Sequence, residues 1–469
     1  MPHLFISAAH KSSGKTTVTL GLCRALKNRG LSVQAFKKGP DYIDPIWHGL
    51  AAGRPSYNLD FHMMREAEIA ALFERHALAA QISLIEGNKG LYDGMDVEGS
   101  NSNAALAKKL NAPVVLVLDT QGMTRGVAPL VLGYQAFDPA VKIAGVILNK
   151  VGGPRHEAKL RAVLERYTDV AVIGAVRMAP ELGIVERHLG LMPGNEAEEA
   201  EARIEAIATR VGAQVDLDAL LRLAATAPAP QQVRRGSIAD AVSEPGTPLT
   251  LAYLHDRAFG FYYQEDLDTL RDTGVRLLAV DTLHDAQLPL CDGLLLGGGF
   301  PEMFAADLAA NIALRADIRR ALCQGLPAYA ECGGLMYLTR SLRWADGRMA
   351  PQPMVGVLAA DTVMGDCPVG RGYALLRETE SAPWPAQADS IPAHEFHYSH
   401  LENLPTDPTY AYRVERGHGI ADGHDGWVQD ALIASYCHRR GSGEQGWIAP
   451  FLQRVRQYRS QRDAARLAA

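Results

Sequence analysis

Residues 4–22 read LFISAAHKSSGKTTVTLGL, and this stretch indicates a strand, a tight loop and a helix in immediate succession. Leu4–Ala8 is an apolar run of strand length, and apolar side chains recur at helical spacing after Gly14. A strand that turns directly into a helix is the unit from which parallel α/β sheets are built. The stretch therefore predicts an α/β fold with a parallel sheet.

The loop inside this stretch matches most of the phosphate-loop pattern G-x-x-x-x-G-K-[ST], with Ala9 in place of the first glycine. Backbone N–H groups of such a loop surround phosphate oxygens, and the positive end of the following helix attracts them. We expect the lysine to reach the β- and γ-phosphates of ATP. The alternative is an ordinary strand-to-helix turn that happens to contain Gly-Lys-Thr. The predicted ATP-binding residues are Ser12, Ser13, Gly14, Lys15, Thr16, Thr17 and Asn149, which closes another strand.

Acidic residues follow two further predicted strands. KKGPDYIDP after Val33–Phe36 contains Asp41 and Asp44, and Glu86 directly follows Ile82–Ile85. Mg²⁺ prefers such hard oxygen ligands and keeps several waters. We therefore predict a magnesium site formed by Thr16, Asp41 and Glu86. Asp41 has a second interpretation, because an aspartate beside a proline also shapes turns.

Bulk composition limits the classes of function. Of the 469 residues, 47% are hydrophobic and 21% are charged, and the formal net charge is -6. This balance predicts globular domains and no nucleic-acid partner, because nucleic-acid binding needs a basic face. No apolar run approaches the ~20 residues that cross a bilayer, so we expect no membrane association. The six cysteines show no Cys-x-x-Cys spacing, which favours reduced thiols and a cytoplasmic protein.

The strand candidates fall in two groups, separated by residues 227–248, APAPQQVRRGSIADAVSEPGTP. This segment is rich in proline and poor in apolar residues, as linkers are. We predict an ATP-binding domain over residues 1–226, a linker over 227–247, a second α/β domain over 248–455 and a tail over 456–469. The predicted strands are Leu4–Ala8, Val33–Phe36, Ile82–Ile85, Val114–Leu118, Ile143–Leu148 and Val170–Val176, then Leu249–Tyr253, Arg276–Val280, Gly293–Leu296 and Leu326–Ala330.

The stretch LPAYAECGGLMYL, residues 326–338, indicates a strand, a sharp turn at Cys332 and a helix. This is the arrangement of a nucleophile elbow, in which a strained turn exposes the reactive atom and glycines give clearance. The predicted oxyanion-hole donors are Gly297, Gly298, Gly299 and Gly333, since acyl transfer needs backbone N–H groups. A structural cysteine is the alternative.

A thiol nucleophile needs a base, and His438 ends the apolar run ALIASYCH. A rival lies in HEFHYSH, which contains His394, His397 and His400. Its histidines also suggest a metal site. We reject the metal interpretation because catalytic zinc sites usually place two histidines at i and i+4 on a helix with a glutamate between them.

Several motifs together resemble a known family. AECGGLMYL, GGGFPE and SYCH look like a class I glutamine amidotransferase domain of flavodoxin-like fold. KKGPDYIDPIWH, SYNLDF, EGNKGLYDG, ERHLGLMP and DRAFGFYYQEDL are similar to the cobyrinic acid a,c-diamide synthases, whose N-terminal P-loop domain is like those of dethiobiotin synthase and MinD. The resemblance covers residues 4 to about 452.

The resemblance implies amidation of the a and c acetate carboxylates of a carboxylated tetrapyrrole, with ATP and glutamine as the other substrates. ATP would form an acyl phosphate, and ammonia from the glutaminase site would attack it. Cys332 would be the nucleophile and His438 its activating partner, as a dyad, because Arg440 stands where many glutaminase triads carry an acid. A homodimer is also compatible with the likeness. The implied substrate-binding residues are Asp41, Tyr42, Asp44, Lys89, Arg187 and His188.

Two alternatives to cobyrinate amidation stay open at this point. Asn88 and Lys89 stand where the family usually carries small or apolar residues, and a lysine suits a ring with many free carboxylates. EGNKGLYDG is similar to a branch of relatives associated with dissimilatory sulfite reductase, for which amidation of sirohaem is the implied reaction. Sirohaem is therefore an alternative substrate. A MinD-like ATPase switch with a degenerate amidotransferase domain is the alternative from another class. Intact Cys332 and His438 argue against that switch.

Overall fold

The computed structural model of the chain describes residues 1–179, 186–187, 190–191, 194, 199–228, 248–385 and 390–468. The chain divides into two compact units, Met1–Arg235 and Gly236–Ala469. Most of the predicted linker, residues 229–247, lies outside the described residues. Within the described residues, no helix combines the length and apolar character that a bilayer crossing requires.

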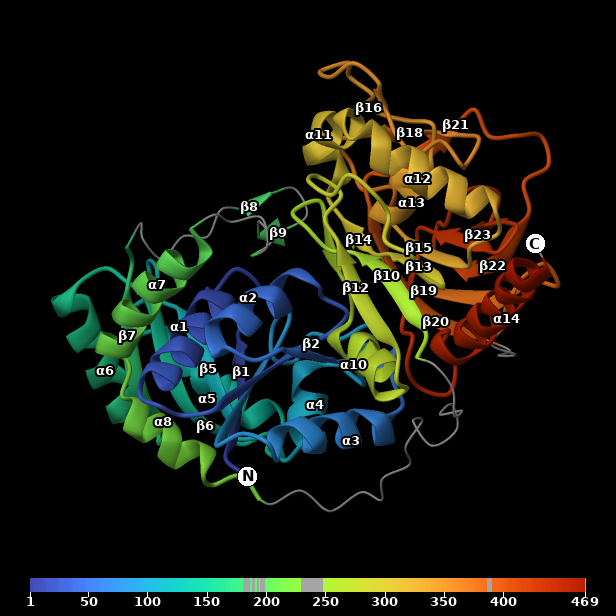
Figure 1. Cartoon of the computed structure of the whole chain (residues 1–469). Helices are drawn as coiled ribbons and strands as arrows, with labels where there is room; N and C mark the ends of the chain where they lie inside the picture. The colour runs from blue at the N-terminus through green and yellow to red at the C-terminus, as the bar shows by residue number, and fades with distance from the viewer. Residues whose placement is uncertain are drawn as a thin grey trace. The chain divides into compact units, whose positions relative to one another are not determined.

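The N-terminal unit is built on a seven-stranded sheet in which every neighbouring pair of strands is parallel. The strand order is β3-β2-β4-β1-β5-β6-β7. Figure 1 labels β1, β2, β5, β6 and β7 of this sheet. Its strands are β1 His3–Ala8, β2 Val33–Lys38, β3 Tyr57–Leu59, β4 Ile82–Glu86, β5 Val114–Asp119, β6 Ile143–Val151 and β7 Ala171–Arg177, and a small hairpin adds β8 Glu186–Arg187 and β9 Gly190–Leu191. All six predicted strands are present, because continuous apolar runs suit strands covered on both faces. The short edge strand β3 was not predicted.

Helices cover both faces of this sheet. Its helices are α1 Lys15–Asn28, α2 Ile43–Ala52, α3 Glu66–Ala77, α4 Asn103–Lys109, α5 Val127–Phe137, α6 Pro154–Tyr167, α7 Ala200–Gln214 and α8 Leu217–Ala224. Apolar residues of α1, α2, α7 and α8 form one core cluster with alternate strand residues such as Leu4 and Ile6. On the other face, Phe73 of α3 packs its ring 5.1 Å from that of Phe36. The carboxyl ends of the parallel strands thus open on one edge, where ligands of such sheets bind.

The C-terminal unit is built on a ten-stranded mixed sheet of order β12-β10-β13-β15-β24-β23-β22-β19-β20-β25. The part from β12 to β24 is parallel, and the part from β24 to β25 is antiparallel. Its strands are β10 Thr250–Leu254, β12 Arg276–Val280, β13 Gly293–Leu296, β15 Ala328–Glu331, β19 Gly370–Glu378, β20 Ile391–His397, β22 Tyr410–Arg416, β23 His424–Gln429, β24 Leu432–Ser435 and β25 His438–Arg439. The four predicted strands lie in the parallel part.

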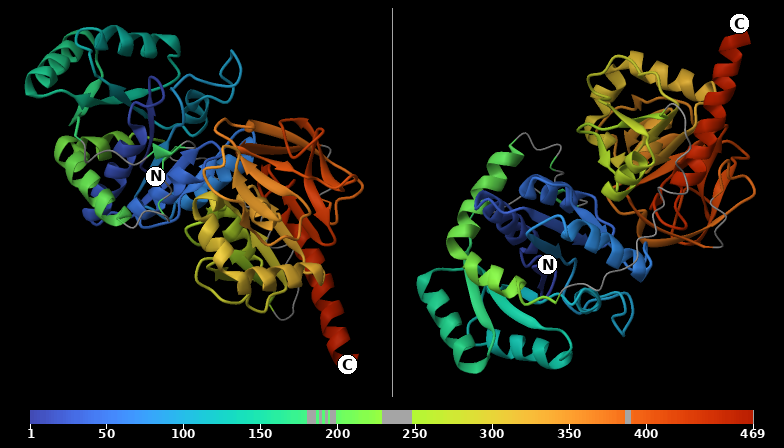
Figure 2. Two further views of the ribbon diagram at one scale, coloured as in Figure 1. Left: turned by 90° about the horizontal axis from the view of Figure 1, so that it is seen from above. Right: turned by 60° about the horizontal axis from the view of Figure 1, so that its bottom comes forward.

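Smaller sheets and further helices complete the described part of this unit. The further strands are β11 Phe259–Phe261, β14 Gly298–Gly299, β16 Ser341–Trp344, β17 Gln352–Pro353, β18 Asp361–Met364 and β21 Ser399–Glu402, and the helices are α10 Gln264–Asp272, α11 Ala305–Ala310, α12 Ile312–Cys323, α13 Gly333–Leu338 and α14 Ile448–Ala468. Helix α14 buries Phe451, Leu452 and Val455 in the core cluster and then projects from the unit (Figure 2). The residues predicted as a tail, 456–468, therefore continue this helix.

Candidate active site

The phosphate loop follows β1 at the open edge of the N-terminal sheet and leads into α1. Ser12 and Gly14 adopt left-handed backbone conformations, with φ of 64° and 84°. The hydroxyl of Tyr134 donates to the Ala9 carbonyl at 2.7 Å. The ammonium of Lys150 donates to the Ser12 carbonyl at 2.9 Å. Groups from α5 and β6 therefore hold the loop in shape.

Asn149, predicted to bind ATP, lies near the end of β6 and contacts the same loop. Its side-chain Nδ2 donates to the Ser13 carbonyl at 2.8 Å. A Cβ atom on Gly14 would lie 2.2 Å from that nitrogen. Asn149 thus supports the phosphate loop through its hydrogen bond to Ser13, and its contact with ATP stays a prediction.

The first residues of α1 meet the acidic side chains that the sequence predicted. Lys15 is buried, and its Nζ donates to the Lys89 carbonyl at 2.8 Å. Burial lowers the pKa of Lys15 to about 8. The hydroxyl of Thr16 donates to Glu86 Oε1 at 2.7 Å and contacts Asp44 Oδ2 at 3.4 Å. The structure therefore brings the phosphate loop and these two carboxylates together.

The sequence interpretation missed a buried lysine in this cluster. Nζ of Lys37, at the end of β2, forms a hydrogen bond with Asp44 and lies 2.8 Å from Glu86 Oε1 and 4.0 Å from Asp41 Oδ2. Burial alone would lower the pKa of Lys37, but the charges of Asp44 and Glu86 raise it well above its usual value. The adjacent KK in KKGPDYIDP was a signal, since a strand end facing phosphates suits a cation.

Glu86 is fully buried and is the centre of the cluster. Its other oxygen, Oε2, lies 2.6 Å from Nε2 of His48 on α2. Burial alone would raise the pKa of Glu86, yet Lys37 and His48 hold it well below its ordinary value. Asp41 behaves differently, because burial and the nearby Asp44 charge raise its pKa to about 6. Asp41 also accepts hydrogen bonds from the N–H groups of Ile43 and Asp44 at 2.9 and 3.0 Å, as the turn interpretation predicted.

The donor set suits magnesium held jointly with a nucleotide. One or two carboxylates and a hydroxyl, completed by phosphate oxygens and waters, are what Mg²⁺ usually binds. Thr16 supplies the hydroxyl, and Asp44 and Glu86, which both contact it, supply the carboxylates. Across the described residues, no group of three His, Cys, Asp or Glu side chains is arranged to hold a metal by itself. The cluster therefore fits a cation that arrives with ATP.

The other predicted substrate-binding residues are Tyr42, Lys89, Arg187 and His188. Tyr42 is buried at the start of α2. The side chain of Lys89 is exposed, while its carbonyl accepts from Lys15. Arg187 belongs to the hairpin strand β8, and His188 lies outside the described residues. Their contact with a tetrapyrrole stays a prediction.

In the C-terminal unit, Cys332 occupies the turn between β15 and α13. Its backbone has φ of 47° and ψ of -101°, which is a strained conformation for a residue with a side chain. Its N–H donates to the Ser435 carbonyl of β24 at 2.7 Å, and its carbonyl accepts from Met336 at 3.0 Å. The surrounding strands therefore enforce the strained turn, as the elbow prediction required.

Glycines allow the elbow to approach two other segments. A Cβ atom on Gly333 would lie 2.9 Å from the nitrogen of Gly299, and one on Gly298 would lie 2.8 Å from Cε1 of His438. These three glycines thus surround the elbow, and they stay candidate oxyanion donors. The N–H of Gly297 instead donates to the hydroxyl of Tyr262 at 2.8 Å. Gly297 is therefore removed from the set of donors and supplies close packing.

The sequence suggested that His438 ends an apolar strand. In the structure, His438 instead begins a separate strand, β25. The fully buried Asp425 causes the break between β24 and β25. Its carboxylate accepts from the hydroxyl of Ser435 at 2.7 Å and from the N–H groups of Tyr436 and Cys437 at 3.0 and 2.9 Å. Strand β25 then pairs with β20, which aligns His438 with His394.

The imidazole of His438 is buried between the thiol and a carboxylate. Its side chain forms hydrogen bonds with Cys332 and with Glu331, and Nδ1 lies 3.1 Å from Glu331 Oε2. Burial alone would lower the pKa of His438, but these two partners raise it to about 10. The sequence implied a dyad of Cys332 and His438, and in the structure a carboxylate from the residue preceding Cys332 also contacts the imidazole. Sequence reasoning missed Glu331 because it searched only beyond the histidine.

The remaining histidines of HEFHYSH have packing contacts. His394 stacks on His438 with ring centres 4.9 Å apart and an interplanar angle of 19°. His397 stacks on Tyr436, and its Nδ1 lies 2.8 Å from the Ser399 carbonyl. His400 is half-buried beside Glu402. Of the three, His394 alone contacts the ring of His438 in the part of the chain that the structure describes.

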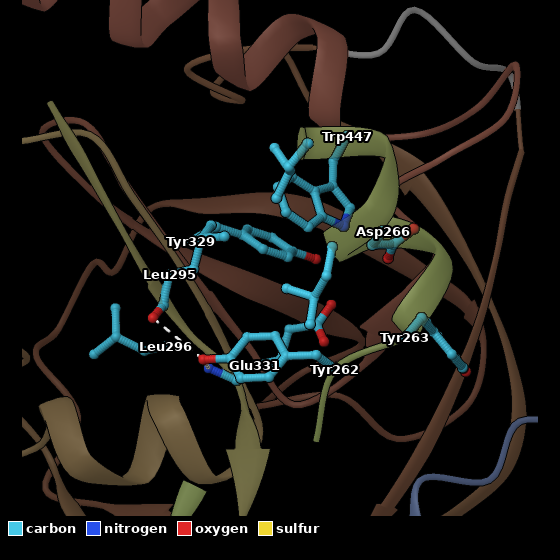
Figure 3. A pocket seen from close by; sticks show the side chains of 11 residues that line it. Tyr262, Tyr263, Asp266, Leu295, Leu296, Tyr329, Glu331 and Trp447 are labelled. Carbon is cyan, nitrogen blue, oxygen red and sulfur yellow. Dashed lines mark hydrogen bonds between the residues drawn. The ribbon is translucent and has the colours of Figure 1, made fainter. Parts of the chain in front are cut away.

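A small cavity lies beside Glu331, between α10 and the strands β13 and β15 (Figure 3). It has room for about one water-sized molecule. Aromatic side chains and two carboxylates line it, from Tyr262, Tyr263, Asp266, Tyr329, Glu331 and Trp447. Burial and the nearby Glu265 raise the pKa of Asp266 to about 7.

Comparisons with known proteins agree with this geometry. Residues 5–191 match the model of the CobQ/CobB/MinD/ParA nucleotide binding domain, and residues 250–444 match that of the CobB/CobQ-like glutamine amidotransferase domain. The chain is 46% identical over 457 residues to the cobyrinate a,c-diamide synthase of Magnetococcus marinus, covering 97% of each chain. The chain belongs to the cobyrinate a,c-diamide synthase family. The relatives from Methanosarcina barkeri and Listeria monocytogenes are 38% and 39% identical, over 98% and 93% of this chain.

Membership of the cobyrinate a,c-diamide synthase family confirms the resemblance and the two-domain α/β fold inferred from the sequence. The matched models account for both motif-bearing segments, the phosphate loop and the cysteine elbow. They leave the individual roles of the site residues as predictions.

Proposed function

We propose that this chain is an ATP- and glutamine-dependent ligase that converts the a and c acetate carboxylates of cobyrinate to amides. Identity of 46% with a cobyrinate a,c-diamide synthase over 97% of both chains is the observation that carries this proposal. A phosphate loop beside buried carboxylates and a cysteine elbow beside a histidine supply the two half-reactions.

In the glutaminase half-reaction, the sulfur of Cys332 attacks the side-chain amide carbon of glutamine. The buried imidazole of His438 takes the thiol proton and gives it to the departing nitrogen, so that the C–N bond breaks and ammonia leaves. The N–H groups around Gly298, Gly299 and Gly333 stabilise the oxygen that becomes negative. Water then hydrolyses the thioester to glutamate, and the thiol is restored.

In the ligase half-reaction, a substrate carboxylate oxygen attacks the γ-phosphorus of ATP, and the bond to ADP breaks. Ammonia next attacks the acyl phosphate, loses a proton and releases phosphate. Lys15 and Lys37 place two ammonium groups beside the phosphate loop, where they offset the charge on the transferred group. Mg²⁺, held by Thr16, Asp44 and Glu86, would neutralise phosphate charge when bound. Asp41 stays a candidate ligand, although burial and the charge of Asp44 raise its pKa to about 6 and so weaken it as a ligand below that pH.

The decisive experiment incubates the protein with ATP, Mg²⁺ and glutamine, with cobyrinate and sirohaem as separate ring substrates. Mass spectrometry should detect two replacements of OH by NH₂ on cobyrinate. Amidation of sirohaem alone would reassign the substrate, and hydrolysis of ATP without ammonia release from glutamine would favour the ATPase switch. Omitting Mg²⁺ should stop amidation but leave glutaminase activity.

Two variants separate the half-reactions. Cys332→Ala should abolish glutamine use and retain amidation with free ammonia, whereas loss of both would make the cysteine structural. Lys15→Ala should stop amidation while some glutamine hydrolysis persists. Lys27→Ala, at the other end of α1 and exposed, is the matched control and should behave as wild type. If Lys15→Ala amidates the ring at the normal rate, the prediction that residues 9–16 bind the phosphates of ATP is wrong.

We also propose that the reaction occurs in the cytoplasm, which the six unpaired cysteines support because thiols persist in reducing compartments. The homodimer stays a prediction that light scattering checks.

A further inference from the structure

The carboxylate of Glu331 contacts the catalytic imidazole on the side away from the thiol. Glu331 Oε2 lies 3.1 Å from Nδ1 of His438, and Oε1 accepts the N–H of Arg439 at 3.0 Å. The exposed fractions of Glu331 and His438 are only 8% and 3%. A buried hydrogen bond of this kind is stronger than one in water, because the local dielectric is low.

This contact decides how the imidazole presents its two nitrogens. A carboxylate beside Nδ1 keeps a proton on that nitrogen, and Nε2 is then left to exchange a proton with the thiol. The contact also keeps the ring from rotating. His394 constrains the same ring from its face, and the hydroxyl of Tyr263 lies 3.1 Å from Nδ1 of His394.

The position where other triads carry an acid is used differently in this chain. Arg440, two residues after His438, forms a double hydrogen bond with Glu265 of α10, at 2.9 and 2.6 Å. The neighbouring Asp266 accepts the N–H groups of Gly441 and Ser442 at 2.7 and 2.8 Å. Glu265 thus holds the side chain of Arg440 and Asp266 holds the backbone after it, whereas Glu331 contacts the imidazole ring of His438.

We propose that Glu331 is a positioning residue for glutamine hydrolysis, which holds Nδ1–H of His438 so that Nε2 faces the sulfur of Cys332. This inference rests on the proposed glutaminase function. In this role Glu331 acts through His438, whose Nδ1 its carboxylate contacts. Because Glu331 and Cys332 are neighbours in the chain, the turn that exposes the nucleophile also carries the acid.

The test substitutes Glu331→Gln, which keeps the size of the side chain and one acceptor oxygen. We expect kcat for ammonia release from glutamine to fall on the order of 100-fold, with little change in KM. Amidation with free ammonia should persist, which also shows that the variant folds. If the wild type releases no ammonia from glutamine, the proposed function fails; if the wild type works and the variant equals it, this inference fails.

The pH dependence of kcat/KM distinguishes positioning from simple structural support. Among the described residues, the charged or titratable groups that face His438 include Glu331 and Cys332 from the elbow and His394 from β20. Removing the Glu331 charge should move the alkaline limb of the profile to lower pH, because the imidazolium loses a stabilising partner. An unmoved alkaline limb would overturn the proposal even if kcat fell.

Two further variants control for loss of a buried charge. Glu395→Gln removes a buried carboxylate on β20 that accepts the N–H groups of His418 and Gly419 at 2.6 and 3.0 Å. It should leave the alkaline limb in place. Glu331→Asp retains the charge and should retain most of the alkaline limb position, with a smaller loss of kcat than Glu331→Gln. A shift of the limb in Glu395→Gln equal to that in Glu331→Gln would contradict the inference.

Discussion

The phosphate loop allows a controlled test, because two glycines with the same backbone conformation lie at opposite ends of α1. Gly14 and Gly30 both have φ of 84°. A Cβ atom on Gly14 would lie 2.2 Å from Nδ2 of Asn149, whereas one on Gly30 would meet nothing within 4 Å. Gly14→Ala and Gly30→Ala therefore share the free-energy cost of a left-handed backbone, and only Gly14→Ala adds the cost of a collision with Asn149.

The shared cost is the left-handed backbone, about 1–2 kcal/mol for a residue with a side chain. Gly14→Ala must in addition displace Asn149 and break its 2.8 Å hydrogen bond to the Ser13 carbonyl. Leaving a buried acceptor without its donor costs about 1–3 kcal/mol more. The difference between the two variants should thus be about 1–3 kcal/mol in the free energy of local unfolding.

Hydrogen exchange of the α1 amides, followed by mass spectrometry, measures this difference within the N-terminal unit. The expected difference corresponds to exchange about 5- to 150-fold faster in Gly14→Ala than in Gly30→Ala. In an Asn149→Ala background, the extra cost of Gly14→Ala should vanish, since the collision and the hydrogen bond are both absent. Equal costs for the two alanine variants, or additivity with Asn149→Ala, would refute the reasoning.

Three further predictions concern charges and hydrogen bonds of the two sites. Lys15, with a pKa lowered to about 8 by burial, should take up close to one proton when ATP binds near pH 9 and almost none near pH 6, which titration calorimetry in buffers of different ionisation enthalpy measures. Asp266 has a folded pKa of about 7 against 3.8 unfolded, so wild type should lose up to ~4 kcal/mol relative to Asp266→Asn as pH rises from about 4 to 7; parallel stability curves would contradict this. Tyr134→Phe removes the hydrogen bond to the Ala9 carbonyl and should cost about 1 kcal/mol in α1 exchange, and no change would mean that the hydroxyl does not hold the loop.

The parallel halves of both sheets could be predicted because their strands are continuous apolar runs. Arg276–Val280 and Gly293–Leu296 appear with the predicted bounds. The antiparallel strands β19 and β22 were not predicted, because their exposed positions interrupt the apolar run. The three-residue β3 has too few residues to show any period.

The site residues that the sequence predicted are those inside local motifs, such as Thr16 and Cys332. The partners it missed come from long-range pairing. Glu331 and His438 are 107 residues apart, and the contact exists because Asp425 ends β24 and lets β25 pair with β20. Lys37 reaches Glu86 because β2 and β4 are neighbours in the sheet. Such neighbours depend on strand order, which a single sequence does not state.

The adjacency of the elbow acid and the thiol has a consequence for control of the enzyme. Both belong to the same turn of the chain, whereas the imidazole of His438 lies on a separate segment, β25. A displacement of β25 would stop the release of ammonia from glutamine without moving the sulfur of Cys332. The return of β25 would restore this activity.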